Sequence, residues 1–153
     1  MAELINELVA GELAMSGQED SARTGFNAEA SALILPGQFV AIATGKEGNL
    51  ERRGLILPVD ANSIIVGACK KWLLREDGHP PLEQVAYYFR GAVGIKVVAN
   101  VKSGDPVYAR FDISANRAHG TNVAGVNAVL VPNARYLSTT ASGKVAIVSL
   151  NLA

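Results

Sequence analysis

Cysteine and histidine are the residue types in this sequence that could carry nucleophilic chemistry. The sequence has one cysteine and two histidines. Such catalysis needs a nucleophile beside a general base that a third group orients. Cys69 ends the apolar run Ile64–Ala68, where a free cysteine usually packs as a small buried residue. His79 and His119 stand among turn residues. A pairing of Cys69 with His79 matches no local catalytic signature, so we expect no catalytic residue and no enzymatic activity.

The same residue types are poorly spaced for holding a metal ion or a cofactor. One cysteine and two isolated histidines form none of the paired spacings that are typical of zinc or calcium sites. The segment Gly91–Gly94 lacks the third glycine and the following helix that a dinucleotide site requires. We therefore expect no metal and no cofactor.

The composition indicates a single domain whose surface is short of charge. The chain has 153 residues, of which 49% are apolar and 18% are charged. The usual charged fraction is about 25%. A surface with few charges often meets another protein rather than water, so the composition favours a protein that works through contacts with partners.

The net charge of zero argues against a general nucleic-acid partner. No apolar run approaches the length of a membrane span, and no signal-peptide pattern opens the chain. We expect no membrane partner and synthesis in the cytoplasm.

The charge is unevenly distributed between the N-terminal segment and the rest of the chain. Residues 1–30 carry six acids and one base, a net charge of −5, which leaves +5 on residues 31–153. Leu4, Ile5 and Leu8 have helical spacing, while the residues that follow are small and polar. We predict that residues 1–30 form an arm that contacts this body or a neighbouring copy. Alternatively, the two oppositely charged parts are solvated surfaces that do not pair.

Residues 31–153 read as a β domain of short strands separated by turns. Valine, isoleucine, leucine and tyrosine dominate the runs, and glycine, proline and asparagine punctuate them. The pattern predicts an all-β fold, a single β-sandwich or barrel-like domain of short antiparallel strands with an extended N-terminal arm. The expected strands are 38–44, 54–59, 63–74, 83–90, 92–101, 106–112, 127–131 and 144–151.

A turn pattern occurs twice in this domain. Ala32, Gly37 and Val40 reappear 67 residues later as Ala99, Gly104 and Val107, each time before an apolar-rich run. A glycine at a fixed place before a β-branched run signals a turn followed by a strand. The repetition predicts that the domain contains two related halves.

Large aromatic and basic residues supply the candidate contact surface. Trp72 follows the basic pair Lys70-Lys71, and Tyr87 and Tyr88 precede Arg90. Neighbouring residues of a strand point to opposite faces, so one tyrosine should face outward, where it could anchor an interface. The candidate interface residues are Leu4, Ile5, Leu8, Glu12, Arg23, Trp72, Tyr87, Tyr88 and Arg90.

Several short motifs, in order along residues 10–152, carry a resemblance to a known family. They are Gly17-Gln18, Asn27–Ala32, Pro36–Val40, Leu57-Pro58, Ile65–Ala68, Val101–Tyr108 and Ala134–Asn151. In this order the motifs resemble the capsid cement, or head decoration, proteins of tailed bacteriophages. The segment Lys70–Arg90 departs from the family pattern, and we interpret it as an added hairpin or contact surface.

The resemblance implies a non-enzymatic virion protein on the outside of an icosahedral head. It would bind the major capsid protein, bridge neighbouring capsomers and stabilise the head. Self-association as a homotrimer, or as a dimer, is also implied. On this basis, deletion of residues 1–30 is expected to leave a folded β core while abolishing capsid binding or self-association.

Three further functions remain open from the sequence. A carbohydrate-binding β-sandwich on the virion surface would stack sugars on Trp72, Tyr87 or Tyr108. A small hydrolase would use Cys69 or His79. A DNA-associated scaffold has the least support because the charge is balanced.

Overall fold

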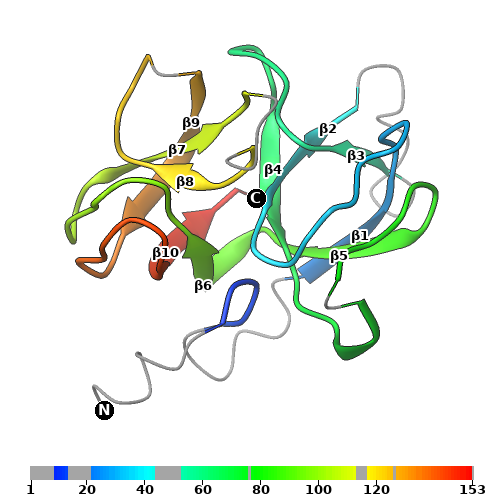
Figure 1. The fold of residues 1–153 in the computed structure, drawn as a ribbon, viewed down its shortest axis with the longest axis horizontal. Helices are drawn as coiled ribbons and strands as arrows, with labels where there is room; N and C mark the ends of the chain where they lie inside the picture. The colour runs from blue at the N-terminus through cyan, green and yellow to red at the C-terminus, as the bar shows by residue number, and fades with distance from the viewer. Residues whose placement is uncertain are drawn as a thin grey trace.

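The structure of the chain is a computed structural model that describes residues 9–13, 22–43, 53–75, 77–112, 117–125 and 127–152. It confirms the predicted all-β class, with a single helical turn at Leu73–Arg75 within the described ranges (Figure 1). Among those residues, no helix has the length and apolar character needed to cross a membrane. The strands are β1 Ala22–Asn27, β2 Phe39–Ile42, β3 Arg53–Ile56, β4 Ile65–Cys69, β5 Gln84–Tyr88, β6 Arg90–Lys96, β7 Pro106–Arg110, β8 Gly120–Thr121, β9 Ala128–Tyr136 and β10 Val145–Asn151.

The first five strands form a closed barrel in the order β1-β3-β2-β4-β5. β1 closes it by pairing in parallel with β3 and antiparallel with β5, while the other neighbours are antiparallel. Closure matters because it removes the strand edges through which sheets otherwise pair with other chains. The inward side chains, among them Val40, Leu55, Val85 and Tyr87, are buried together as the barrel's own core.

The last five strands form a second sheet in the order β6-β10-β9-β7-β8. All of its named pairings are antiparallel. Its two ends approach each other where Val97, just after β6, forms a parallel bridge with Gly120 of β8. The backbone N–H of Val98 also donates to the Gly120 carbonyl at 2.9 Å. The second sheet therefore curls almost into a barrel as well.

The two sheets have the same strand order, which confirms the predicted two related halves. β6, β8, β7, β9 and β10 take the places of β1, β3, β2, β4 and β5. The correspondence includes the parallel approach of the first strand to the third in each half. β2 meets β4 through Phe39 and Ala68, and β7 meets β9 through Pro106 and Arg135, each 67 residues later.

The repeated turns have matching hydrogen bonds. Gly37 and Gly104 both have positive φ, of 79° and 94°, which glycine adopts without steric cost. Their N–H groups donate to equivalent carbonyls, those of Cys69 at 2.9 Å and Tyr136 at 2.7 Å. In each turn a side-chain oxygen, from Gln38 or Asp105, accepts a backbone N–H three residues earlier at 2.8 Å. The sequence repeat thus records a duplicated structural unit.

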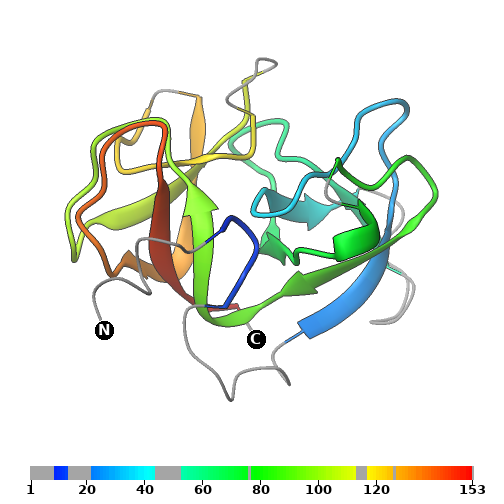
Figure 2. The ribbon, with the colours of Figure 1, turned by 60° about the horizontal axis from the view of Figure 1, so that its bottom comes forward.

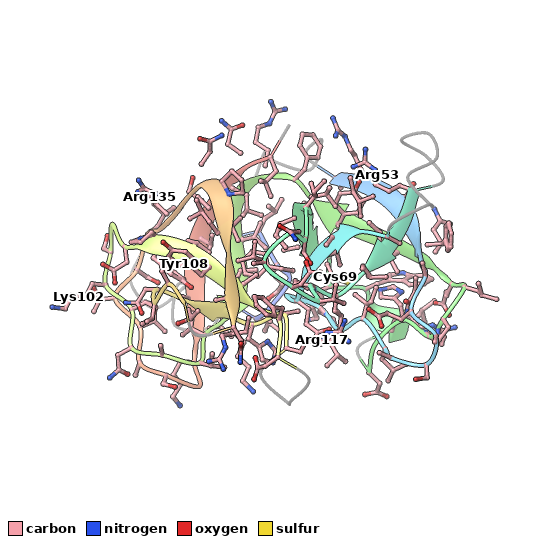
Figure 3. All side chains as sticks on the ribbon, turned by 90° about the horizontal axis from the view of Figure 1, so that it is seen from above. Arg53, Cys69, Lys102, Tyr108, Arg117 and Arg135 are labelled. Carbon is pink, nitrogen blue, oxygen red and sulfur yellow. The ribbon has the colours of Figure 1, made fainter. Side chains whose placement is uncertain are left out.

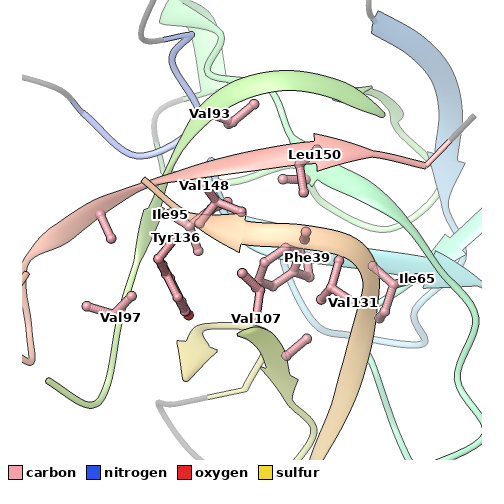
Figure 4. Packing of buried hydrophobic residues seen from close by; sticks show 14 of the residues in the cluster. Phe39, Ile65, Val93, Ile95, Val97, Val107, Val131, Tyr136, Val148 and Leu150 are labelled. Carbon is pink, nitrogen blue, oxygen red and sulfur yellow. The ribbon is translucent and has the colours of Figure 1, made fainter. Parts of the chain in front are cut away.

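A second core joins the two halves. Figure 4 shows Phe39 and Ile65 of the barrel packed with side chains of the second sheet, including Val107 and Val131. At the junction the Arg117 guanidinium lies 3.3 Å from a Glu29 carboxylate oxygen and donates to the Pro58 carbonyl at 3.0 Å (Figure 3). Apolar packing and this largely buried ion pair hold the halves together.

The N-terminal boundary of the β domain differs from the prediction. Ala22–Asn27, which composition places in an arm, forms β1 and completes the barrel. Phe26 is the single large apolar residue of this segment, and the interior position Gly25 has no room for a side chain, because an added Cβ would lie 2.5 Å from the Arg53 carbonyl oxygen. Val9–Leu13 forms a turn and a bridge to β6 rather than a helix. Residues 1–8 and 14–21 lie outside the described ranges.

The expectation that Tyr87 or Tyr88 faces outward is wrong, because both are buried. They do point to opposite faces of β5, as strand geometry requires. Tyr87 points into the barrel, and Tyr88 points into the core between the halves. Alternation exposes every second residue only where one face of a sheet meets water, and β5 packs on both faces.

Several strand boundaries also differ from the sequence pattern. The strand expected over 63–74 ends at Cys69, and the strand expected to end at residue 131 continues to Tyr136. Pro132 and Asn133 look like strand breakers, but they fall where the register of β7 and β9 shifts, and Asn133 has a φ of 57°. A β-bulge accommodates such residues within a strand.

Two buried tyrosines provide a test of the core. The Tyr136 hydroxyl donates to the Thr121 carbonyl at 3.0 Å, whereas the buried Tyr87 hydroxyl has no hydrogen-bond partner among the described residues. We expect Tyr136→Phe to lower the free energy of unfolding by about 1–2 kcal/mol because a buried carbonyl loses its partner. Tyr87→Phe should be neutral or stabilising. Urea denaturation measures the free energy of unfolding of both variants. An equal loss in the two would contradict the assignment of a hydrogen bond to the Tyr136 hydroxyl alone.

Candidate functional site

The described surface is hollowed on both sides of Lys71. One hollow, of about 500 Å³, is bounded by Lys70, Lys71, Trp72 and His79. Thr24 and Ala86, which are paired across β1 and β5, also line it, together with Glu83 and Gln84. Two further hollows adjoin Lys71, one beside Gly11–Leu13 and one beside Leu35 and Lys96. We call this combined surface the Lys71 groove.

Backbone hydrogen bonds hold the N-terminal segment at the edge of the Lys71 groove. The Lys71 N–H donates to the Gly11 carbonyl at 3.0 Å, and Gly11 in turn donates to the Gly94 carbonyl at 2.8 Å. The Glu12 carboxylate lies 3.9 Å from the Lys71 ammonium. In Figure 2 the blue loop containing Val9–Leu13 lies on the same face as the green turn of Leu73–Arg75. Segments that are distant in sequence therefore build one surface.

Trp72 and His79 form the aromatic wall of the groove. Their ring centroids are 6.2 Å apart with an interplanar angle of 11°, which is a stacked arrangement. Trp72 is 48% exposed, while His79 is buried. Burial lowers the pKa of His79, although its Nδ1 lies 3.7 Å from a Glu83 carboxylate that favours the charged form. A largely neutral imidazole thus backs a half-exposed indole.

Four of the candidate interface residues that the structure describes lie on the surface, in two separate places. Glu12 and Trp72 lie at the Lys71 groove, whereas Arg23 and Arg90 gather around Phe89. The Arg23 guanidinium carbon lies 4.1 Å from the Phe89 ring centroid, and that of Arg90 lies 5.4 Å from it.

The remaining candidates contribute little to the described surface. Tyr87 is fully buried, and Tyr88, which is 6% exposed, lines only the hollow beside Gly11–Leu13. Leu4, Ile5 and Leu8 lie outside the described residues.

Sequence reasoning missed the contributions of His79 and Leu35 to this surface. In the sequence His79 stands among turn residues, and Leu35 precedes Pro36 in the first copy of the repeated turn. A bridge between Ile34 and His79 brings the two segments together, and a Cβ added to Gly78 would lie 2.9 Å from the Leu35 side chain. Local sequence carries no signal for such a long-range pairing.

Cys69, the candidate nucleophile, is poorly placed to react. Cys69 is buried in the barrel core, and burial raises the pKa of its thiol to about 12. The thiol is the weakly nucleophilic form, so Cys69 is a poor nucleophile near neutral pH. Within the described part of the chain, no three histidine, cysteine, aspartate or glutamate side chains cluster as metal ligands would.

Comparison with known proteins places these observations in a family. The family model for the structural cement protein (E217 gp24/Pam3 gp6) matches residues 3–151. A solved structure, the capsid of Myoviridae phage XM1, contains a chain that aligns with a TM-score of 0.71 and 24% sequence identity. The alignment covers 96% of this chain and 92% of that one, so the two share a fold along their length. The comparison with curated proteins found no match. Because the family match spans nearly the whole sequence, the chain belongs to the phage structural cement protein family.

Proposed function

We propose that this protein binds the outer surface of a phage capsid, where it cements neighbouring capsomers and stabilises the head. The family match over residues 3–151 carries the proposal. The major capsid protein would be its partner. Further support comes from the fold shared with a chain of the phage XM1 capsid structure.

The structure suits a role that depends on rigid contacts rather than on a reaction. The closed barrel and the curled second sheet share a core, so the chain can transmit force between surfaces at either end. Interiors packed at the density of organic crystals transmit strain with little compression. A head with internal pressure would be held by many such contacts, each modest and each repeated by the capsid symmetry.

Self-association as a homotrimer, or as a dimer, belongs to the same proposal. It would let each copy reach more than one capsomer through equivalent contacts. The exposed large apolar side chains, among them Ile64, Trp72, Leu74 and Leu82, offer surface for contacts with a capsid or with another copy.

The structure gives no support to the carbohydrate-binding alternative. Of the three aromatic residues expected to stack sugars, Tyr87 is fully buried and Tyr108 is partly buried. Trp72 already stacks on His79. The hydrolase alternative would need a reactive thiol, which the buried Cys69 does not supply.

Binding to heads that lack the protein tests the proposed function. We expect the purified chain to co-sediment with such heads, to saturate at a fixed ratio to capsid protein, and to raise the temperature at which the heads release DNA. Heads already carrying the protein serve as the control and should bind no more of it. Recovery of the chain only in the supernatant, with unchanged head stability, would reject the proposal.

A further inference from the structure

We propose that the Lys71 groove is the docking site for an acidic, extended peptide segment of the major capsid protein. The proposal rests on the proposed function and assigns it a surface. Trp72 would provide an apolar contact for the segment, and the lysines around the groove would contact its carboxylates.

Comparison of the two halves shows that the loop carrying Trp72 is longer than the fold requires. In the second half, residues 137–144 connect β9 to β10, a span of eight residues. In the barrel, residues 70–83 make the equivalent connection from β4 to β5 with fourteen. The six additional residues are not required to join the strands, since the shorter loop serves the same topology. They instead carry side chains to the surface beside the groove.

These loop residues expose apolar side chains in an unusual concentration. Leu74 is 70% exposed and Leu82 is 80% exposed, in the same loop as the half-exposed Trp72. Leu82 also has a φ of 70°, a left-handed conformation that is costly for a residue with a Cβ. Val9, Leu33 and Leu35, from segments that pack beside the loop, are exposed as well. Exposed apolar side chains gathered in this way mark interaction sites.

The charges around the groove favour an acidic partner. Lys70, Lys71 and Lys96 line its three hollows, with Glu12 and Glu83 as the acids. Both acids already have basic neighbours: Glu12 lies near Lys71, and Glu83 pairs with Arg75. The Lys70 ammonium instead lies 5.6 Å from the Tyr88 ring centroid, and Lys96 is exposed. A carboxylate in the groove would therefore meet ammonium groups that lie clear of the two acids.

The size of the hollow favours an extended segment rather than a helix. Thr24 and Ala86, paired on the neighbouring strands β1 and β5, line it together with Trp72. At about 500 Å³ the hollow admits a few side chains. An α-helix is about 10–12 Å across with its side chains and rises about 5.4 Å per turn, so roughly one turn would fill a hollow of this volume. An extended chain instead places every second side chain into such a hollow.

Point variants at the groove test this docking site on heads that lack the protein. We expect Trp72→Ala and Lys70→Glu each to weaken co-sedimentation by about tenfold or more, as for anchor residues of other interfaces. Lys70→Arg, which keeps the charge, should stay within about threefold of wild type. Leu137→Ala is the matched control, because Leu137 is half exposed in the equivalent loop of the second half, and it should bind as wild type does. Wild-type binding by Trp72→Ala and Lys70→Glu would overturn the proposal.

Thiol labelling supplies an independent readout. A cysteine at Leu74 should react with a thiol reagent in the free chain and be protected on heads, while Cys69 stays buried and silent. A cysteine at the exposed Ser142, in the equivalent turn of the second half, should react in both states. Equal reactivity of the Leu74→Cys variant with and without heads would overturn the docking site. If the wild-type chain does not bind heads at all, the proposed function itself fails.

The alternative occupant to be tested is the chain's own acidic segment, residues 1–8. Trp72 is the single tryptophan, so its fluorescence reports directly on the groove. Deletion of residues 1–8 should leave the acrylamide quenching of Trp72 in the free chain unchanged. Greater quenching after the deletion would mean that this segment covers the groove and would count against a capsid segment as its occupant.

Discussion

Deletion of residues 1–30 is expected to abolish cooperative folding, whereas deletion of residues 1–8 should leave the fold intact. The longer deletion removes β1, the strand that closes the barrel between β3 and β5. Opening the barrel exposes Val85 and Tyr87 to water and leaves two strands with unpaired edges. The loss is comparable with the whole net stability of a domain, about 5–15 kcal/mol.

The same deletion removes a set of buried polar contacts. The Asn27 side chain donates to the carbonyls of Ala32 at 3.0 Å and His79 at 2.8 Å, which ties β1 to the loop that carries Trp72. Glu29, which pairs with Arg117 at the junction of the halves, is lost as well. The carbonyls and the guanidinium that are left without these partners add to the loss of stability.

Urea denaturation followed by circular dichroism distinguishes the two truncations. The 1–8 deletion should show one transition with a wild-type midpoint and slope. The 1–30 deletion should lack a cooperative transition or be recovered as aggregates. A 1–30 deletion that unfolds cooperatively with the wild-type slope would show that β1 is dispensable, in agreement with the expectation from composition alone.

Gly67→Ala is expected to lower the free energy of unfolding by about 3 kcal/mol, the largest effect we expect from a single methyl group here. An added Cβ at Gly67 would lie 2.3 Å from the Tyr88 carbonyl oxygen and 2.7 Å from the Tyr87 ring. Both contacts belong to β5, and the nearer one is backbone, so relief requires the two strands to separate. The barrel has little room for this movement because it is closed.

Thermal unfolding measures the Gly67→Ala effect, with Gly143→Ala as the control. A Cβ at Gly143 meets no atom within 4 Å, but its φ of 87° makes alanine strained there by about 1–2 kcal/mol. The control therefore isolates backbone strain from steric overlap. The melting temperature of Gly67→Ala should lie about 5–10 °C below that of the wild type. The melting temperature of Gly143→Ala should lie between those two values. A smaller loss for Gly67→Ala than for Gly143→Ala would contradict the close approach of β4 and β5.

The duplication explains why one methyl group has such different consequences in the two halves. The position equivalent to Gly67, 67 residues later, is Ala134, which is buried without difficulty. β9, which carries Ala134, is longer than β4, and its register shift against β7 spans more residues than the shift of β4 against β2. The two halves thus kept their topology while their strand packing diverged, and the glycine is needed only in the fully closed barrel.

Much of the scaffold can be predicted from the sequence because its signals are local. Short β-branched runs between turn residues indicate an all-β fold, since strand propensity and turn geometry act over a few residues. The repeat of Gly37 as Gly104 identifies two halves, because a positive φ before a strand favours glycine in both. The ordered motifs likewise indicate the cement family, which the match over residues 3–151 confirms.

Only the tertiary structure decided which faces meet water and which distant segments meet each other. The pattern of alternation could not show that both Tyr87 and Tyr88 are buried, because the second core depends on a sheet that begins after β5. Composition likewise could not identify β1, whose place depends on pairing with strands far along the chain. The Lys71 groove is assembled in the same way, from Val9–Leu13, Leu35 and the loop of Trp72. Local preferences specify strands and turns, but a surface built by long-range pairing exists only once the whole chain has folded.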